Sequence, residues 1–180
     1  MDGKTAIFEL SIFKSLLESG SLVGTEEELY QLLDTIMDAT SQVFSAEASS
    51  LLLVEEETNT VFFKIATGDK GEMVEGVHLE VGEGIAGWVA ESGQSLVVNS
   101  PEDDPRHAWL LASIINFQTK NILCVPLKDE KEGVVGVIEV LNKKEGPFTP
   151  DDKDALQLLA RKITRVVLQA KAGAKKSPQN

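Results

Sequence analysis

One acidic residue of this chain, Glu139, lies in an apolar stretch where an ionised side chain is costly. Glu139 lies between Ile138 and Val140, and a carboxylate in such an apolar run either reaches solvent or is held by a partner inside a cavity. If the run is a strand, Val135 and Val137 share the face of Glu139, and the residues between them share the other. Both faces are then apolar, and both are expected to be covered. We therefore predict that Glu139 is substantially buried and available to hydrogen-bond a ligand.

Residue types that commonly build catalytic or metal sites are scarce. The chain has one cysteine and two histidines. Cys124 alone can form neither an internal disulfide nor a multi-thiolate metal site, and its apolar surroundings predict a buried core residue. His78 and His107 stand far apart in the sequence and are interpreted as ordinary surface groups. No nucleophile, base and orienting group can be recognised together, so we predict a protein that binds rather than catalyses and that holds no metal.

The net charge and the length of the apolar runs indicate which classes of partner the chain does not bind. The 180 residues include 29 acidic and 17 basic side chains, with a net charge of -12, which opposes non-specific attraction to nucleic acid or anionic lipid. No apolar run reaches the roughly 20 residues that span a bilayer, and the N-terminus has no signal-peptide pattern. We expect one cytoplasmic domain with neither a nucleic-acid nor a membrane partner.

Three amphipathic helices are predicted from apolar residues at three- and four-residue spacings. The first covers residues 5–18. The second begins at Thr25, whose side chain can form a capping box with that of Glu28. The third has Thr149 as its N-cap and Pro150 as its first residue. The polar segment 171–180 is expected to be disordered.

Short apolar runs between turn residues predict the strands. Residues 50–54 and 61–65 flank a polar turn and indicate a β-hairpin, and residues 121–127 and 134–142 indicate a second. Weaker strands are expected at 77–81 and 94–99. Between these two, Gly82, Gly84 and Gly87 predict a tight turn into a short helix, and residues 109–117 predict a short helix or an ordered lid. This order of elements is typical of an α+β domain.

Three segments carry a family resemblance, at residues 81–90, 119–127 and 136–143. In this order and spacing they resemble the GAF domain, the sensory module of phosphodiesterases, cyclases and bacterial regulators. The chain is most similar to the phosphodiesterase and cyclase branch, because four of its residues match that branch's Asn-Lys, Phe and Asp-Glu motif: Asn142, Lys143, Phe148 and Asp152. Lys153 stands where the motif ends in glutamate.

The resemblance implies an antiparallel sheet of about six strands, with N- and C-terminal helices on one face and a pocket formed by loops and short helices on the other. The GAF-like sensory domain is expected at residues 25–170, after a dimerisation helix in residues 1–24 and before a tail at 171–180. A pair between Lys143 and Asp152 would tie the sheet edge to the last helix. We assign that pair a structural role.

In cyclic-nucleotide-binding members of the family, the ligand lies between the sheet and the short helices. The ligand-binding positions implied here are Ser50, Ile85, Ala86, Trp109, Ile115, Thr119 and Glu139. Two features depart from the binders. Residues 66–68 read Ala-Thr-Gly where a Phe-Asp pair is usual, and the lid helix has Ala112 and Ile115 in place of polar groups. A pocket with fewer polar partners loses base specificity. A cyclic nucleotide is the candidate ligand, and no cofactor is assigned.

Two functions remain open at this point. In the first, the domain is a non-catalytic signalling module that binds a small molecule, such as a cyclic nucleotide or another purine-like ligand, and acts on a downstream signalling protein. In the alternative, it is a ligand-free GAF domain for dimerisation or protein interaction. Both include a homodimer, because the first and last helices carry more apolar surface than one sheet can cover. The residues concerned are Ile7, Leu10, Phe13, Leu17, Ile163, Val167 and Ala170.

Overall fold

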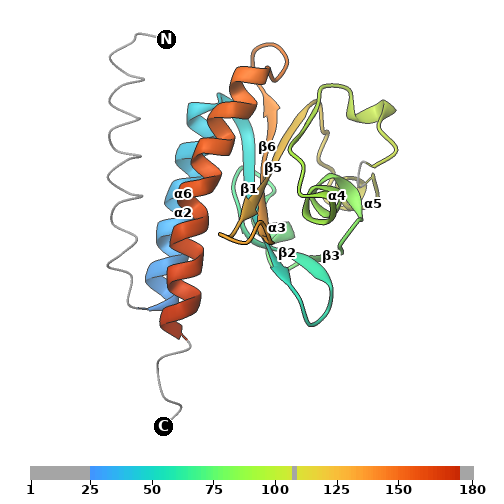
Figure 1. The fold of residues 1–180 in the computed structure, drawn as a ribbon. Helices are drawn as coiled ribbons and strands as arrows, with labels where there is room; N and C mark the ends of the chain where they lie inside the picture. The colour runs from blue at the N-terminus through green and yellow to red at the C-terminus, as the bar shows by residue number, and fades with distance from the viewer. Residues whose placement is uncertain (1–24, 107–108, 175–180) are drawn as a thin grey trace, which may run out of the picture.

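A six-stranded antiparallel sheet forms the centre of the protein, with helices on both of its faces (Figure 1). The computed structural model describes residues 25–106 and 109–174. The strands are β1 (Ala46–Glu55), β2 (Thr60–Ala66), β3 (His78–Glu80), β4 (Leu96–Val98), β5 (Ile122–Lys128) and β6 (Val134–Lys143). Their order across the sheet is β3-β2-β1-β6-β5-β4. The α+β class and the two hairpins predicted from the sequence are confirmed.

Two long helices cover one face of the sheet, α2 (Glu26–Val43) over β1 and β2 and α6 (Pro150–Ala174) over β5 and β6. The predicted capping box of α2 is present, since Thr25 and Glu28 each accept a hydrogen bond from the other's backbone N–H. Thr149 and Asp152 form the same reciprocal pair at the start of α6.

The last helix is longer than the sequence indicated. Disorder was expected from Lys171 onward, but α6 continues to Ala174, so that expectation was wrong for residues 171–174. Extending an existing helix costs far less than starting one, and alanine, present at 172 and 174, is the strongest helix former. The expected tail beyond Ala174 and the expected dimerisation helix in residues 1–24 lie outside the described residues.

The sheet has an apolar core on each face. Beneath α2 and α6 the core includes Leu33, Ile36, Met37, Leu51, Ile65, Leu123, Ile138, Leu156, Ile163 and Val167. Ile163 and Val167 were expected to contribute an apolar surface for dimerisation. Both side chains are instead buried in this core, because α6 packs closely on β5. No helix in the described part of the chain is long and apolar enough to cross a membrane.

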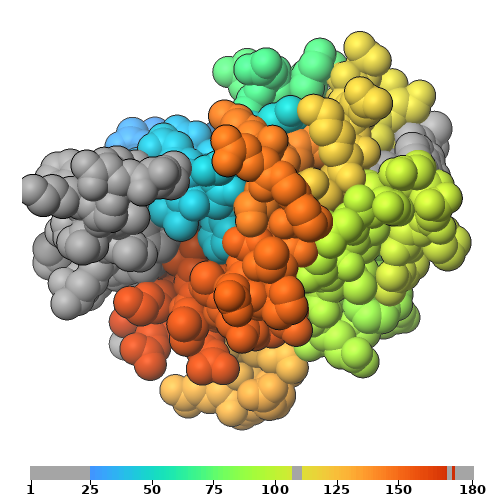
Figure 2. All heavy atoms as spheres, turned by 90° about the horizontal axis from the view of Figure 1, so that it is seen from above, coloured from blue at the N-terminus to red at the C-terminus, as the bar shows by residue number. Residues whose placement is uncertain are grey.

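The second face carries α3 (Gly71–Val74), α4 (Gly84–Ser92) and α5 (Trp109–Ile114). In the view from above, the green and yellow segment that holds α4 lies away from α2, which is blue (Figure 2). The core on this face includes Leu52, Val61, Ile85, Val89, Ile122, Cys124 and Val137. Cys124 is a buried free thiol, as predicted.

One prediction about alternation in β6 was wrong. Val135 was expected on the face of Glu139, but it packs against the core beneath α2 and α6. The cause is a β-bulge, because Lys128 pairs with Val134 while the preceding Leu127 pairs with Gly136. Val135 is therefore an extra residue in β6, and an extra residue shifts the period of two on one side of it.

Candidate ligand-binding pocket

A cavity of about 100 Å³ lies on the face of the sheet opposite α2 and α6. Its floor is formed by strands β1, β2 and β6, and its walls by α3, α4, α5 and residues 117–119. Most of the lining side chains are apolar. Among the described residues that line it, Glu139 is the one carboxylic acid and Lys70 the one amine.

Glu139 is 7% exposed, as the covered faces of β6 predicted. Strand pairing places it in a row with Ser50 of β1 on one side and Cys124 of β5 on the other. The Ser50 hydroxyl donates a hydrogen bond to Glu139 Oε2 at 3.3 Å. Among the described residues, no lysine, arginine or histidine nitrogen lies within 4.0 Å of this carboxylate.

This environment favours the neutral form of the acid. Burial raises the pKa of Glu139 to about 7, and the hydrogen bond from Ser50 opposes the shift. The neighbouring Cys124 thiol also has a raised pKa, because of its burial and then of the negative charge on Glu139. The floor of the pocket therefore holds a carboxyl group that changes its proton occupancy near neutral pH.

Six of the seven predicted ligand-binding residues line this one cavity: Ser50, Ile85, Ala86, Ile115, Thr119 and Glu139. Residues from four separate parts of the chain thus meet as the family resemblance implied. Trp109 is the first residue of α5, but its side chain lies outside the described part of the structure. Whether these residues bind a ligand stays a prediction.

The glycine segment turns as the sequence indicated. Gly82 and Gly84 have positive φ angles of 96° and 68°, which a side chain would disfavour. A Cβ atom on Gly87 would lie 2.6 Å from the carbonyl oxygen of Glu80. This close approach lets α4 pass over the end of β3, which brings Ile85 and Ala86 to the cavity.

Sequence reasoning missed one wall of the cavity, formed by Lys70, Gly71 and Val74 in and beside the short helix α3. A Cβ atom on Gly71 would lie 2.0 Å from the carbonyl oxygen of Ala66, so this position requires glycine. The wall is held from the other face of the sheet. Tyr30 of α2 donates its hydroxyl to the two carboxylate oxygens of Glu75, at 2.8 and 3.0 Å. Gly68 and Gly71 were the signal in the sequence for this turn.

A second wall is positioned by Asn142, the last but one residue of β6, which has a positive φ of 58°. Its amide nitrogen donates to Gln118 O and to Glu47 Oε2, both at 2.8 Å. Its amide oxygen accepts from the backbone N–H of Lys120 at 2.7 Å. These bonds hold both neighbours of Thr119, the residue of this segment whose type could hydrogen-bond a ligand.

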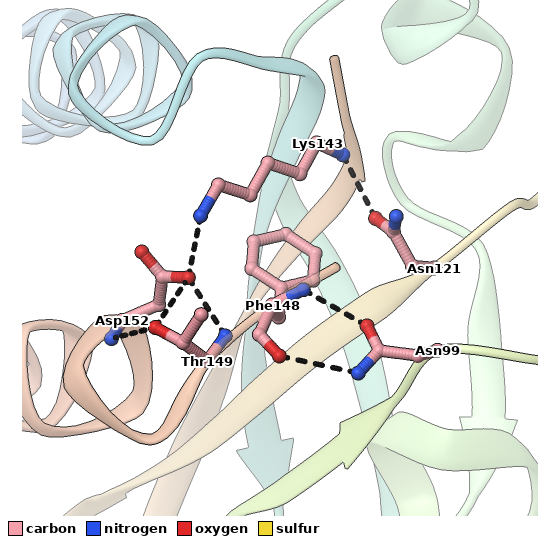
Figure 3. A network of polar contacts seen from close by, with 6 residues as sticks. All are labelled: Asn99, Asn121, Lys143, Phe148, Thr149 and Asp152. Atoms are coloured by element: carbon pink, nitrogen blue, oxygen red, sulfur yellow. Dashed lines mark hydrogen bonds and ion pairs between the residues drawn. The ribbon is translucent and has the colours of Figure 1, made fainter. Parts of the chain in front are cut away.

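The remaining motif residues form a network at the start of α6 (Figure 3). The predicted pair is present, since Lys143 Nζ lies 2.6 Å from Asp152 Oδ2, which also accepts from Thr149. The Lys143 backbone N–H donates to Asn121. Phe148 is buried, and its backbone N–H and carbonyl both bond the Asn99 side chain, at 2.9 and 3.1 Å. The motif therefore joins the ends of β4, β6 and α6.

Comparison with known families supports the resemblance. The model of the GAF domain family matches residues 28–167. A probable 3′,5′-cyclic phosphodiesterase of Caenorhabditis elegans is 30% identical over 134 residues, which cover 69% of this chain and 18% of that protein. The dual 3′,5′-cyclic-AMP and -GMP phosphodiesterase 11 of Drosophila melanogaster is 31% identical over 159 residues, 81% of this chain and 10% of that protein. The chain thus spans less than a fifth of these relatives.

Solved structures show the same fold at lower identity. The GAF domain of a phosphoenolpyruvate-protein phosphotransferase from Coxiella burnetii superposes with a TM-score of 0.79 at 17% identity, covering 94% of this chain and 98% of that one. The free methionine-R-sulfoxide reductase from Neisseria meningitidis superposes with a TM-score of 0.74 at 15% identity, covering 93% of each chain. The fold thus occurs in at least one protein named as an enzyme.

Proposed function

We propose that this chain, which belongs to the GAF domain family, is a non-catalytic cytoplasmic signalling module whose small ligand binds beside Glu139. The observation that carries the proposal is a carboxyl group that is almost fully buried in an apolar cavity and has one hydrogen-bond donor among the described residues. Buried polar groups are normally satisfied. A mostly apolar pocket with a few convergent polar groups is typical of small-molecule sites.

A cyclic nucleotide is the first candidate ligand. Of the two relatives that are about 30% identical, one is named as a probable 3′,5′-cyclic phosphodiesterase and the other as a dual 3′,5′-cyclic-AMP and -GMP phosphodiesterase. Ser50, Thr119 and Glu139 offer polar atoms for a base, and Ile85, Ala86 and Ile115 offer apolar contacts. The cavity of about 100 Å³ is smaller than the roughly 300 to 1,000 Å³ of typical ligand sites. A nucleotide would therefore need α5 to move outward.

The small volume also favours a second candidate, a ligand-free domain for dimerisation or protein interaction. Both candidates include a homodimer formed through the terminal helices, and a downstream signalling protein as a further partner. A single, fully buried thiol at Cys124 supports the non-catalytic part of the proposal. Light scattering at micromolar concentration should give about twice the chain mass of 19.5 kDa. A mass near that of one chain would exclude the dimer.

Calorimetric titration with cyclic GMP and cyclic AMP separates the two candidates. Ala112→Phe would fill the cavity from α5, since Ala112 lines it. Ser113→Phe on the same helix is the matched control, because Ser113 is exposed and does not line the cavity. Saturable binding that is lost in Ala112→Phe and kept in Ser113→Phe would support the binding module. Absence of binding and of any shift in melting temperature would favour the ligand-free domain.

A further inference from the structure

We propose that the proton on Glu139 selects which base edge the pocket accepts. The ionised carboxylate takes an edge with two adjacent N–H donors, and the protonated acid takes an edge with one donor and one acceptor. The inference rests on the proposed function and adds a rule of specificity to it. One residue would then make ligand choice depend on pH.

The geometry leaves both oxygens of Glu139 available to a ligand. Ser50 is the one described donor, and its bond to Oε2 is long, at 3.3 Å. Oε1 accepts no hydrogen bond from the described residues. An ionised carboxylate can only accept hydrogen bonds, whereas a carboxylic acid donates one and accepts others. The two forms therefore present different arrangements of hydrogen-bond donors and acceptors to a planar base that lies against the floor of the pocket.

Both forms of Glu139 occur in the neutral range. Its pKa is raised to about 7 by burial, against the opposing effect of Ser50. Among the described residues of other elements, the titratable groups on this side of the sheet near the carboxyl group are Cys124, which pairs with Glu139 from β5, and Lys70, which lines the cavity beside α3. The described lining residues from α4, α5 and residues 115–119 are uncharged: Ile85, Ala86, Leu111, Ala112, Ile115, Phe117 and Thr119. Among the described residues that line the pocket, there is no second carboxylate to share or mask the titration.

The two purine bases differ in the way that this carboxyl group can read. Guanine presents two adjacent donors, its ring N1–H and exocyclic amino group, on the edge where adenine presents an amino donor beside a ring acceptor. Two donors match the carboxylate, and adenine does not offer them. A donor beside an acceptor matches the acid, and both adenine and the N1–H and O6 of guanine offer such a pair, so the preference for guanine arises when the acid ionises. The Thr119 hydroxyl both donates and accepts, so it does not distinguish the two bases.

The test compares the dissociation constants of cyclic GMP and cyclic AMP at about pH 5.5 and about pH 8, which lie on either side of the titration. The preference for cyclic GMP should rise by at least about tenfold with pH. Glu139→Gln supplies one donor and one acceptor that do not titrate, so its ratio of the two dissociation constants should be the same at both pH values. Cys124→Ala is the matched control and should keep the pH effect of the wild type.

Infrared difference spectra of the unliganded protein give an independent reading. A carboxylic acid C=O band that is absent from Glu139→Gln should disappear as the pH rises through neutrality. If this variant does not fold, the inference is still tested by the loss of the band in the wild type and by the wild-type ratio of the two dissociation constants at each pH. A pH-independent ratio, or a pH effect that persists in Glu139→Gln, would overturn the inference and leave the proposed function standing. Failure of both nucleotides to bind at both pH values would reject the inference and the proposed function together.

Discussion

Two polar side chains on the same strand, β6, have opposite surroundings. Glu139 is 7% exposed and, among the described residues, has one long hydrogen bond in an apolar cavity. Asn142 is 1% exposed, and both ends of its amide are bonded at 2.7 to 2.8 Å. A fully satisfied buried network makes a structure rigid, whereas an unsatisfied group costs stability. The end of β6 therefore braces the pocket, while its middle retains bonding capacity that a ligand can use.

The largest loss of stability is expected from Asn142→Ala. It removes three hydrogen bonds of a buried side chain and leaves the Gln118 carbonyl and Lys120 N–H without this partner. The free energy of unfolding should fall by roughly 3 kcal/mol, as judged by urea denaturation. Asn142→Gly is the control that keeps the positive φ accessible. A change within about 0.5 kcal/mol of wild type would show that this network does not act as a brace.

Ligand affinity should depend on Glu139 rather than on the hydrogen bonds of Asn142. Glu139→Ala is expected to weaken cyclic GMP binding by roughly 1.5 to 3 kcal/mol, the range for a hydrogen bond to a charged group. The fold should remain intact, because removal of the carboxyl group leaves only the Ser50 hydroxyl without its described acceptor. Calorimetry on folded protein measures the effect. Equal affinities of variant and wild type would remove Glu139 from the site.

Glu139 should lower the free energy of unfolding as the pH rises to neutrality, unlike the uncharged side chain of Asn142. Its pKa is raised from 4.5 in an ordinary setting to about 7 in the fold, so the native state binds the proton more tightly than the unfolded state. The free energy of unfolding of the wild type then falls as the pH rises from 4.5 to about 7. Glu139→Gln does not titrate, and its advantage should grow by roughly 2 kcal/mol between about pH 5.5 and about pH 8.5. Parallel stability curves would contradict the raised pKa.

The smallest expected effect is that of Asp152→Ala, a loss of roughly 1 kcal/mol of stability at neutral pH. Burial acts to raise the pKa of Asp152, but the hydrogen bonds from Lys143 and Thr149 outweigh it and leave the pKa lowered. The contribution is present above the unfolded pKa and is lost as the pH falls through the folded one. Cyclic nucleotide affinity should not change. Unchanged melting together with lost binding would show that the pair belongs to the site.

The parts of the fold that depend on local sequence could be predicted. The capping box at Thr25 and the N-cap at Thr149 each depend on residues within one helical turn, and the strand runs show their own period. Burial of Glu139 followed from the apolar residues on both faces of β6. The positions of the pocket residues followed from the family resemblance, which covered most of the chain.

What could not be predicted depends on contacts between distant residues. The four residues of α3 are too few to give a periodic pattern, and their place depends on the bond from Tyr30 to Glu75. The side that Val135 faces is set by a bulge in its pairing with β5, which the sequence of β6 alone does not record. The burial of Ile163 depends on how closely α6 approaches the sheet.

The strand order also bears on how the protein folds. β1 and β6 are neighbours at the middle of the sheet, although the whole chain between Glu55 and Val134 separates them. The hairpins β1-β2 and β5-β6 close short loops, but the pairing of β1 with β6 must close the long one before its hydrogen bonds form. Such non-local pairing slows folding. We expect the joining of β1 to β6 to limit the refolding rate, so that substitutions at their contacts change refolding more than those in the hairpin turns.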